Sequence, residues 1–254
     1  ANTTHQQSLS GSYTRLGDLA QAAGNPTEAE RLHRQALDID ERLAGLDPAN
    51  TTHQHNLSVS YTRLGDLARA AGNPAEAERL HRQALDIRER LAGLDPANTT
   101  HQHNLSVSYN RLGDLAQAAG DPAEAERLHR KALTISERLV GLDPANTAYQ
   151  HNLSVSYNRL ADLAQAAGNP TEAERLHRQA LAIDERLAGL DPANTTHQQS
   201  LSVSYTRLAD LAQAAGDPTE AERLHRQALA IDERLVGLDP ANTDPSERTD
   251  REQP

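Results

Sequence analysis

The stretch DPANTTHQ, residues 95–102, recurs with small changes along the chain at a constant spacing. Its asparagine falls at Asn2, Asn50, Asn98, Asn146, Asn194 and Asn242, and every step is 48 residues, as in 98 − 50 = 48. The chain therefore contains five copies of one unit, 1–48, 49–96, 97–144, 145–192 and 193–240. A fixed period of this size is typical of a solenoid, in which each unit buries its apolar face against its neighbours.

The composition limits which side chains can form the core and argues against some classes of function. The 254 residues include no Phe, Trp, Cys or Met, and Tyr supplies all the aromatic side chains. An interior of Leu, Ala, Ile, Val and Tyr favours closely packed helices over a deep aromatic ligand pocket. The net charge of −11 argues against nucleic-acid binding, which needs clustered Lys and Arg.

The compartment is predicted only indirectly. No run approaches 18 apolar residues, so no membrane span is predicted, and no secretory leader opens the chain. We therefore expect a cytoplasmic protein. Lys131 is the only lysine among 25 basic residues, and this arginine bias favours a high-GC, bacterial genome.

The second copy predicts two helices. From Leu57 the apolar residues follow a helical spacing up to Ala71, and Gly72 ends this first helix. Asn50 or Thr51 is placed to cap its start. Each helix should contain roughly 20 residues, and the two should run antiparallel within a unit.

The second helix has a strong start signal in residues 73–76, Asn-Pro-Ala-Glu. Asn73 is a suitable N-cap, Pro74 suits the first helical position, and Glu76 completes a capping box. We expect Glu76 to pair with Arg79 in addition, as Glu78 should pair with Arg82. The helix should end before Asp95-Pro96, because proline cannot continue a helix.

These features resemble the tetratricopeptide repeat. Tyr61, Leu64-Gly65, Gly72, Ala77 and Ala84-Leu85 fall at that family's spacing, and the other copies match in the same way. The resemblance covers about residues 1–240. The family's unit usually has 34 residues, so this repeat resembles the longer variants of the kinesin light chain type. The resemblance implies an all-α solenoid of five helix-turn-helix repeats in a right-handed superhelix, without catalytic activity or cofactor.

Histidines recur without predicting a metal site. His53 and His55 are two residues apart on a helix and point away from each other. Equivalent histidines of different copies should lie on the order of 10 Å apart, too far to share one ion. The set His33, His81, His129, His177 and His225 replaces an aromatic packing residue, so we expect half-buried structural imidazoles.

The resemblance places the first helices on a concave, ligand-binding face. The residues it implies for peptide binding are Asp18, Thr62, Asp66, Arg69, Asn110, Asp114, Asn158, Asp162, Thr206 and Asp210. The carboxylates would form an acidic ladder for Arg or Lys side chains of a partner peptide. The alternative, which we favour, is a local ion pair with the arginine three residues earlier, as in Arg63 with Asp66.

Thirty-four of the 48 repeat positions are identical in all copies, and this near-identity argues against a single active site. We expect the variable positions largely on the surface, among them Gly11 against Val59, Thr14 against Asn110, Gln21 against Arg69, and Asp40 against Arg88 and Ser136. The sequence predicts a protein-interaction scaffold. Its alternatives are a self-associating spacer array and a sensor segment of a nucleotide-switch protein.

The ends suggest self-association. Residues 241–254 form a polar tail that we expect to be disordered. The last second helix should leave Leu224, Leu229, Ile231 and Leu235 uncovered, because no polar cap follows it. End-to-end contact between molecules is the expected result. The alternative is that the rest of a larger protein supplies the missing neighbour.

Overall fold

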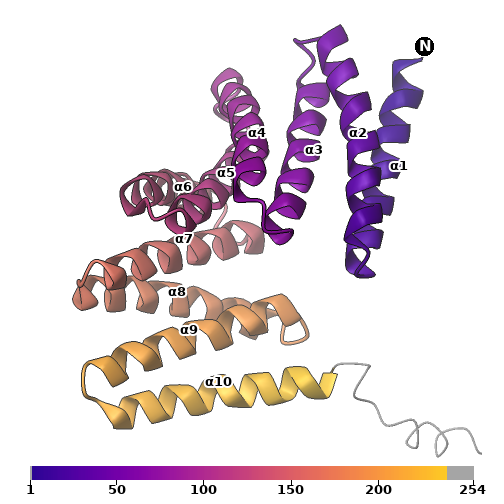
Figure 1. Ribbon diagram of the computed structural model, residues 1–254. Helices are drawn as coiled ribbons and strands as arrows, with labels where there is room; N and C mark the ends of the chain where they lie inside the picture. Colours follow the sequence, from indigo (N-terminus) through magenta and orange to yellow (C-terminus); the bar gives the residue numbers. More distant parts are fainter. Residues whose placement is uncertain (1, 239–254) are drawn as a thin grey trace, which may run out of the picture. The chain divides into compact units, whose positions relative to one another are not determined.

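The computed structural model describes residues 2–238, and every regular element in this part of the chain is an α-helix (Figure 1). The first helices of the five repeats are α1 (Thr3–Ala22), α3 (Thr51–Ala70), α5 (Thr99–Ala118), α7 (Thr147–Ala166) and α9 (Thr195–Ala214). The second helices are α2 (Pro26–Leu46), α4 (Pro74–Leu94), α6 (Pro122–Leu142), α8 (Pro170–Leu190) and α10 (Pro218–Leu238). The all-α class and the helix-turn-helix repeat are confirmed. The predicted tail, 241–254, lies outside the described residues.

The chain divides into two compact units, Ala1–Ile135 and Ser136–Pro254, with the boundary inside α6. Within each unit the most extensive contacts join the two helices of one repeat, such as α3 with α4 and α7 with α8. The next most extensive join a second helix to the first helix of the following repeat, such as α2 with α3 and α8 with α9. The structure thus uses two kinds of helix contact, one within a repeat and one at a junction between repeats.

Local signals set the helix ends. Asn50 caps α3, because its Oδ1 accepts hydrogen bonds of 3.1 Å from the backbone N–H groups two and three residues ahead. Gly72 adopts φ +73° in the turn to α4, a left-handed conformation that glycine reaches without strain. Asn73 then caps α4 by accepting a 3.3 Å hydrogen bond from the N–H of Glu76. These caps agree with the sequence prediction.

The capping box is only half formed. The Glu76 carboxylate accepts two hydrogen bonds of 2.7 Å from Arg79, so it faces along the helix surface and not back toward Asn73. The predicted pairs of Glu76 with Arg79 and Glu78 with Arg82 are both present. The reciprocal half of the box does not form, because the backbone N–H of Asn73 already donates to the carbonyl oxygen of Ala68 at 2.9 Å.

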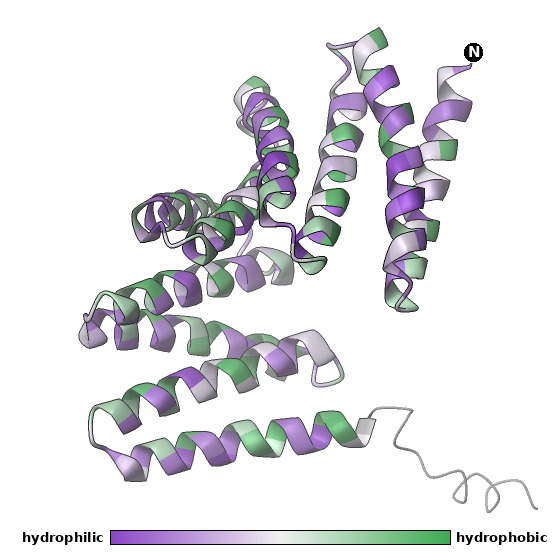
Figure 2. Cartoon of the chain, in the orientation of Figure 1, coloured by the Kyte–Doolittle hydropathy of each residue, from purple (hydrophilic) through white to green (hydrophobic). Residues whose placement is uncertain are grey.

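Leucine and alanine fill the space between helices, and Figure 2 shows apolar and polar residues alternating around each helix. In the second repeat, Leu57, Tyr61, Leu64 and Leu80 are buried in one cluster. Each fully buried leucine contributes roughly 1.5–3 kcal/mol relative to an exposed one. The hydroxyl of Tyr61 donates to Glu41 of the preceding repeat at 2.8 Å, so the junction between repeats has a polar edge.

Two of the variable positions that were predicted on the surface are buried. We number a repeat position by its place in the 48-residue unit, so that Asp40, Arg88, Ser136, Asp184 and Asp232 share position 40. The residues at position 40 in the first four repeats are buried, as are Thr62, Asn110 and Asn158 at position 14. The prediction was wrong there, because these polar side chains have hydrogen-bond partners inside the array. Position 21 is exposed at Arg69, as predicted.

Candidate functional surfaces

The carboxylates at position 18 form ion pairs between repeats. Arg111 Nε and Nη2 donate to the two carboxylate oxygens of Asp66 at 3.0 and 3.1 Å. The equivalent pairs are Arg63 with Asp18 at 3.1 Å and Arg207 with Asp162 at 3.0 Å. The predicted local pair is therefore wrong in its partner, because the arginine side chain reaches across to the preceding first helix. These three carboxylates are neutralised by arginine and do not form an open acidic ladder.

A buried histidine lies behind these ion pairs. His81 Nε2 is 3.5 Å from Asp66 Oδ1, and His177 Nε2 is 3.6 Å from Asp162 Oδ1. Removal from water lowers the pKa of both imidazoles to about 4, and Asp66 opposes this shift at His81 only in part. Both rings are neutral at pH 7. Histidines at this position are fully buried in the first four repeats, more deeply than predicted.

Asparagine at position 14 holds the histidine in two repeats. Asn158 Oδ1 lies 2.8 Å from His177 Nδ1, and Asn110 Oδ1 lies 3.1 Å from His129 Nδ1. An amide oxygen only accepts, so each Nδ1 carries the proton. In the second repeat, Thr62 instead donates to the backbone of its own helix at 2.8 Å. Asparagine at position 14 therefore joins the two helices of its repeat, whereas Thr62 bonds within its own helix.

Position 40 forms a second buried polar row that sequence reasoning missed. Asp40 accepts hydrogen bonds from Ser10 at 2.8 Å and from Ser60, in the next repeat, at 2.7 Å. Arg88, at the same position one repeat on, donates to Ser108 at 2.6 Å. Burial raises the pKa of Asp40 and lowers that of Arg88 to about 10. The signal was available in the two serines that recur at positions 10 and 12 of every copy.

The first-helix face of the second unit has a hollow between α7 and α9. It holds about 270 Å³ and is lined by Val155 and Arg159 from α7 and by Gln199, Val203 and Arg207 from α9, among others. A second hollow of about 430 Å³ adjoins it and shares its three α9 residues. Together they present two valines among amide, hydroxyl and guanidinium groups. The valines recur at position 11 in four copies, a signal that the sequence analysis did not use.

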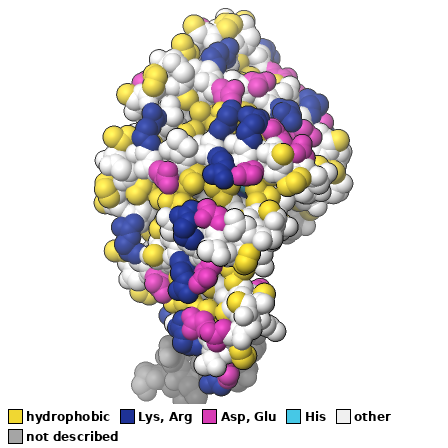
Figure 3. All heavy atoms as spheres, turned by 90° about the vertical axis from the view of Figure 1, so that its left-hand side faces the viewer, with side chains coloured by type: hydrophobic (Ala, Val, Ile, Leu, Met, Phe, Trp, Pro, Cys, Tyr) yellow, Lys and Arg dark blue, Asp and Glu magenta, His cyan; other side chains and the backbone are white. Residues whose placement is uncertain are grey.

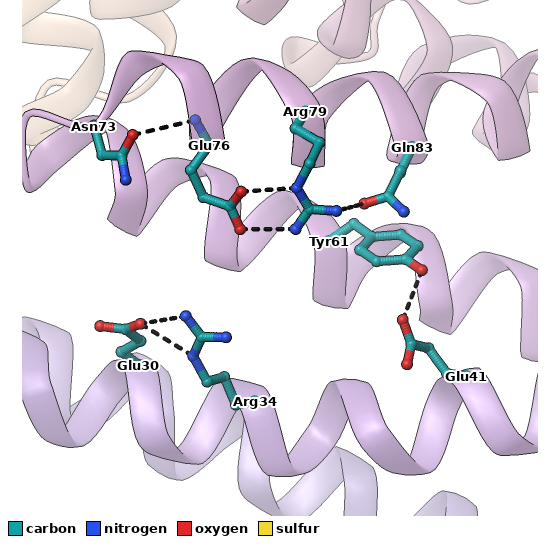
Figure 4. Close-up of polar contacts among 8 residues, drawn as sticks. All are labelled: Glu30, Arg34, Glu41, Tyr61, Asn73, Glu76, Arg79 and Gln83. Atoms are coloured by element: carbon teal, nitrogen blue, oxygen red, sulfur yellow. Dashed lines mark hydrogen bonds and ion pairs between the residues drawn. The ribbon is translucent and has the colours of Figure 1, made fainter.

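A groove between successive second helices recurs in both units. In the first unit it holds about 160 Å³ between α2 and α4, with Leu64 and Leu67 of α3 at its floor. Figure 4 shows its rims, Glu30 with Arg34 on α2 and Glu76 with Arg79 on α4. The equivalent groove between α8 and α10, over α9, holds about 380 Å³. Each rim is neutral because its carboxylate and guanidinium pair with each other.

The ten residues predicted to bind a peptide fall into two groups. Those with exposed or partly exposed side chains are Asp18, Asp66, Arg69, Asp114, Asp162, Thr206 and Asp210. Those that are buried are Thr62, Asn110 and Asn158. Asn158 and Thr206 border the two hollows of the second unit. Peptide binding by this set stays a prediction, and the buried members offer little surface to a partner.

The chemistry of the described surface is that of paired charges. On the face in Figure 3, Lys and Arg side chains lie beside Asp and Glu side chains, with apolar groups between them. Among residues 2–238, no three His, Asp or Glu side chains are placed to share a metal ion. None of the helices in the described part is long and apolar enough to cross a membrane. The arrangement is suited to holding a polypeptide by an apolar contact with polar groups around it.

Sequence comparison identifies the family. The profile of the tetratricopeptide repeat matches residues 8–90, 60–138, 104–186 and 152–234, so the overlapping matches cover most of the chain. The chain belongs to the tetratricopeptide-repeat family. Tetratricopeptide-repeat proteins are generally non-catalytic scaffolds for protein interactions. A search of curated proteins returned no match.

Solved structures with this repeat agree. BtubC (BKLC) from P. vanneervenii is 23% identical with a TM-score of 0.71, over 94% of this chain and 85% of that one. A putative kinesin light chain from Podosopora anserina, with nearly identical TPR-like repeats, is 25% identical with a TM-score of 0.59, over 91% of this chain and 98% of that one. The tetratricopeptide repeat in its long, kinesin-light-chain-like form is therefore confirmed.

Proposed function

We propose that this chain is a non-catalytic scaffold that binds an extended peptide or a partner helix on its first-helix face. The hollow between α7 and α9 carries the proposal, because it places Val155 and Val203 beside Gln199 on an open surface. Val203 is one of the few large apolar side chains exposed in the middle of a helix, at 46%. The general role of the tetratricopeptide family in protein interaction supports this function.

The hollow favours a ligand with an apolar side chain. Such a side chain would cover Val203. The side-chain amide of Gln199 can both donate a hydrogen bond to a peptide backbone and accept one from it. A basic ligand side chain is less favoured at Asp162, because it would have to displace Arg207. It would find a more open carboxylate at Asp210, the most exposed of the five aspartates at position 18.

Peptide selection from a random phage-displayed library tests the proposal. Peptides enriched on the unmodified chain are synthesised with a fluorophore, and their Kd values are measured by anisotropy for Val155→Asp, Val203→Asp and Leu190→Asp. The two valine variants should bind at least about tenfold more weakly, since a ligand would desolvate the new carboxylate against an apolar group. Leu190→Asp is the matched control, because Leu190 is also exposed but lies outside the hollow.

Equal affinity in all four proteins would refute the assignment of the binding face, and a library that enriches no peptide would refute peptide binding itself. Far-UV circular dichroism of each variant checks that helix content is unchanged. The sequence also raises end-to-end self-association, which would involve the same end of the array, because Asp232 of α10 lines the second hollow together with Val203.

A further inference from the structure

We infer that copies of this chain join head to tail, with α10 of one copy packing on α1 of the next as α8 packs on α9 within the chain. The interaction surface has two halves. The head is the side of α1 that exposes Leu9, Leu16 and Leu19. The tail is the side of α10 that exposes Leu229 and Val236, together with Asp210 of α9. The partner that these halves fit is a second copy.

The head exposes leucines that every other described first helix buries. Leu16 and Leu19 are 51% and 66% exposed, whereas their counterparts Leu208 and Leu211 in α9 are 4% and 7% exposed. The difference arises because α8 covers α9, and no preceding repeat within this chain covers α1. An α8-like helix placed on α1 would remove these leucines from water, which is the main driving force for association.

The tail has the complementary exposure. Leu229 and Val236 are 55% and 56% exposed, whereas Ala188, the counterpart of Val236, is buried in the cluster that joins α8 to α9. Leu224, Ile231 and Leu235 were predicted to be uncovered as well. Leu224 and Ile231 are buried and Leu235 is partly buried, because all three pack against α9 of the same repeat.

The sequence of the missing junction is nearly that of an observed one. Helix α10 reads PTEAERLHRQALAIDERLVGL and differs from α8 only by Val236 in place of Ala188. Helix α1 reads TTHQQSLSGSYTRLGDLAQA and differs from α9 only by Gly11 in place of Val203 and Gly17 in place of Ala209. Position 17 faces the histidine of the same repeat, so this change lies off the junction. The two ends therefore have the residues of the α8–α9 contact except at Val236, which is larger than the buried Ala188 by two methyl groups.

Polar groups at the ends match in the same way. The junction between the fourth and fifth repeats is bordered by three polar contacts, Arg207 on Asp162 of α7 at 3.0 Å, Tyr205 on Glu185 of α8 at 2.8 Å and Ser204 on Asp184 of α8 at 2.6 Å. The head carries the equivalent donors, Arg15, Tyr13 and Ser12. The tail carries the equivalent acceptors, Asp210, Glu233 and Asp232, all of them exposed. Donors at one end and acceptors at the other specify head-to-tail contact over head-to-head or tail-to-tail contact.

Other exposed leucines do not belong to these surfaces. Leu46, Leu94, Leu142 and Leu190, at the ends of the second helices, are 65–68% exposed in every repeat. A junction with the next repeat leaves their exposure unchanged. They supply matched controls, because they are as exposed as the head and tail residues but lie outside the contact.

The test uses the full chain and two end-blocked variants. Leu16→Asp with Leu19→Asp blocks the head, and Leu229→Asp with Val236→Asp blocks the tail. In analytical ultracentrifugation the average mass of the unmodified chain should rise with concentration, from the monomer mass of 27.6 kDa to a mass larger than that of a dimer. Each blocked variant alone should stay a monomer. Their equimolar mixture should form a dimer and nothing larger, because it has one open head for each open tail.

Several outcomes overturn the proposal. An unmodified chain that stays at its monomer mass at all concentrations excludes the contact. A blocked variant that dimerises alone shows a like-with-like contact, and loss of association in the control pair Leu94→Asp with Leu142→Asp places the contact elsewhere. Failure here leaves peptide binding on the first-helix face untouched, because neither blocked variant alters Val155 or Val203.

Charge reversal tests the register of the contact. Arg15→Asp alone and Asp210→Arg alone should each lower the association constant by at least about two- to fivefold, because each reversal removes one exposed ion pair and places two like charges opposite each other. The chain with both substitutions should regain association, because the reversed head and tail again attract. Absence of this recovery would contradict an α8–α9-like register.

Discussion

Acid should destabilise this array through histidines that are buried in neutral form. Burial lowers the pKa of His81 and His177 to about 4 in the folded chain, against 6.5 for an imidazole in water. The unfolded chain therefore binds protons first as the pH falls. Each histidine's contribution to stability is complete above pH 6.5 and is lost progressively between pH 6.5 and 4. A difference of about 2.5 units corresponds to about 3 kcal/mol for each histidine.

Buried aspartates act in the opposite direction. Burial raises the pKa of Asp40 and Asp184, so these carboxyls bind protons in the folded chain before they do so in the unfolded chain. As the pH falls, their protonation offsets part of the loss. The total pH dependence is thus a sum of opposing contributions, and a variant is needed to isolate the part that His81 supplies.

Urea unfolding of the unmodified chain, His81→Gln and His225→Gln separates these contributions. Stability is measured by far-UV circular dichroism at steps of pH and fitted with a nearest-neighbour scheme, because repeat arrays need not unfold in two states. Near pH 5, His81→Gln should reduce the slope of unfolding free energy against pH by about 1.2 kcal/mol per pH unit. His225 occupies the same repeat position, with its side chain 44% exposed, and serves as the matched control. A slope in His81→Gln equal to that of the unmodified chain would refute the reasoning.

Two further experiments test the packing. Gly113→Ala should stabilise the chain by up to about 1 kcal/mol, because glycine weakens a helix interior. The new Cβ would lie 2.5 Å from the ring of His129. The next repeat accommodates Ala161 at this position, so we expect the ring to shift. A loss of unfolding free energy above about 1 kcal/mol in urea unfolding would contradict this expectation. A double-mutant cycle on Asp66 and Arg111, each changed to Ala, should give a coupling energy of about 0.5–1 kcal/mol for their half-buried pair, and a coupling of zero would show that the contact does not stabilise the junction.

Local sequence signals predicted the fold well, and contacts between repeats were harder to predict. Gly72, Asn73 and Pro74 set the turn and the start of α4 through contacts with residues close to them in sequence. The helix ends therefore follow from the sequence alone. The partner of Asp66 does not. Two arginines stand at equivalent positions on neighbouring helices, and only the spacing of those helices decides that Arg111, and not Arg63, reaches the carboxylate.

Variation between the copies was misread for a similar reason. A change from Asp40 to Arg88 at equivalent positions, one carboxylate against one guanidinium, is typical of an exposed site. It is tolerated in the interior because each of these residues lies between serine hydroxyls, and a hydroxyl donates to a carboxylate as readily as it accepts from a guanidinium. The identity of the serines was visible in the sequence, but their placement on both sides of position 40 depends on how one repeat packs on the next.

The same serines bear on assembly. If Asp, Arg and Ser all fit at position 40 between identical serine rows, this buried position does not specify which repeat may follow which. Asp232 in the last repeat is the same residue as Asp184, and Ser12 in the first is the same as Ser204, so a second copy offers α10 the contacts that α9 offers α8. Position 40 therefore does not distinguish a following repeat of the same chain from the first repeat of another molecule. Near-identity of the repeats therefore makes the ends competent to join, and the mixture of head-blocked and tail-blocked chains measures whether they do.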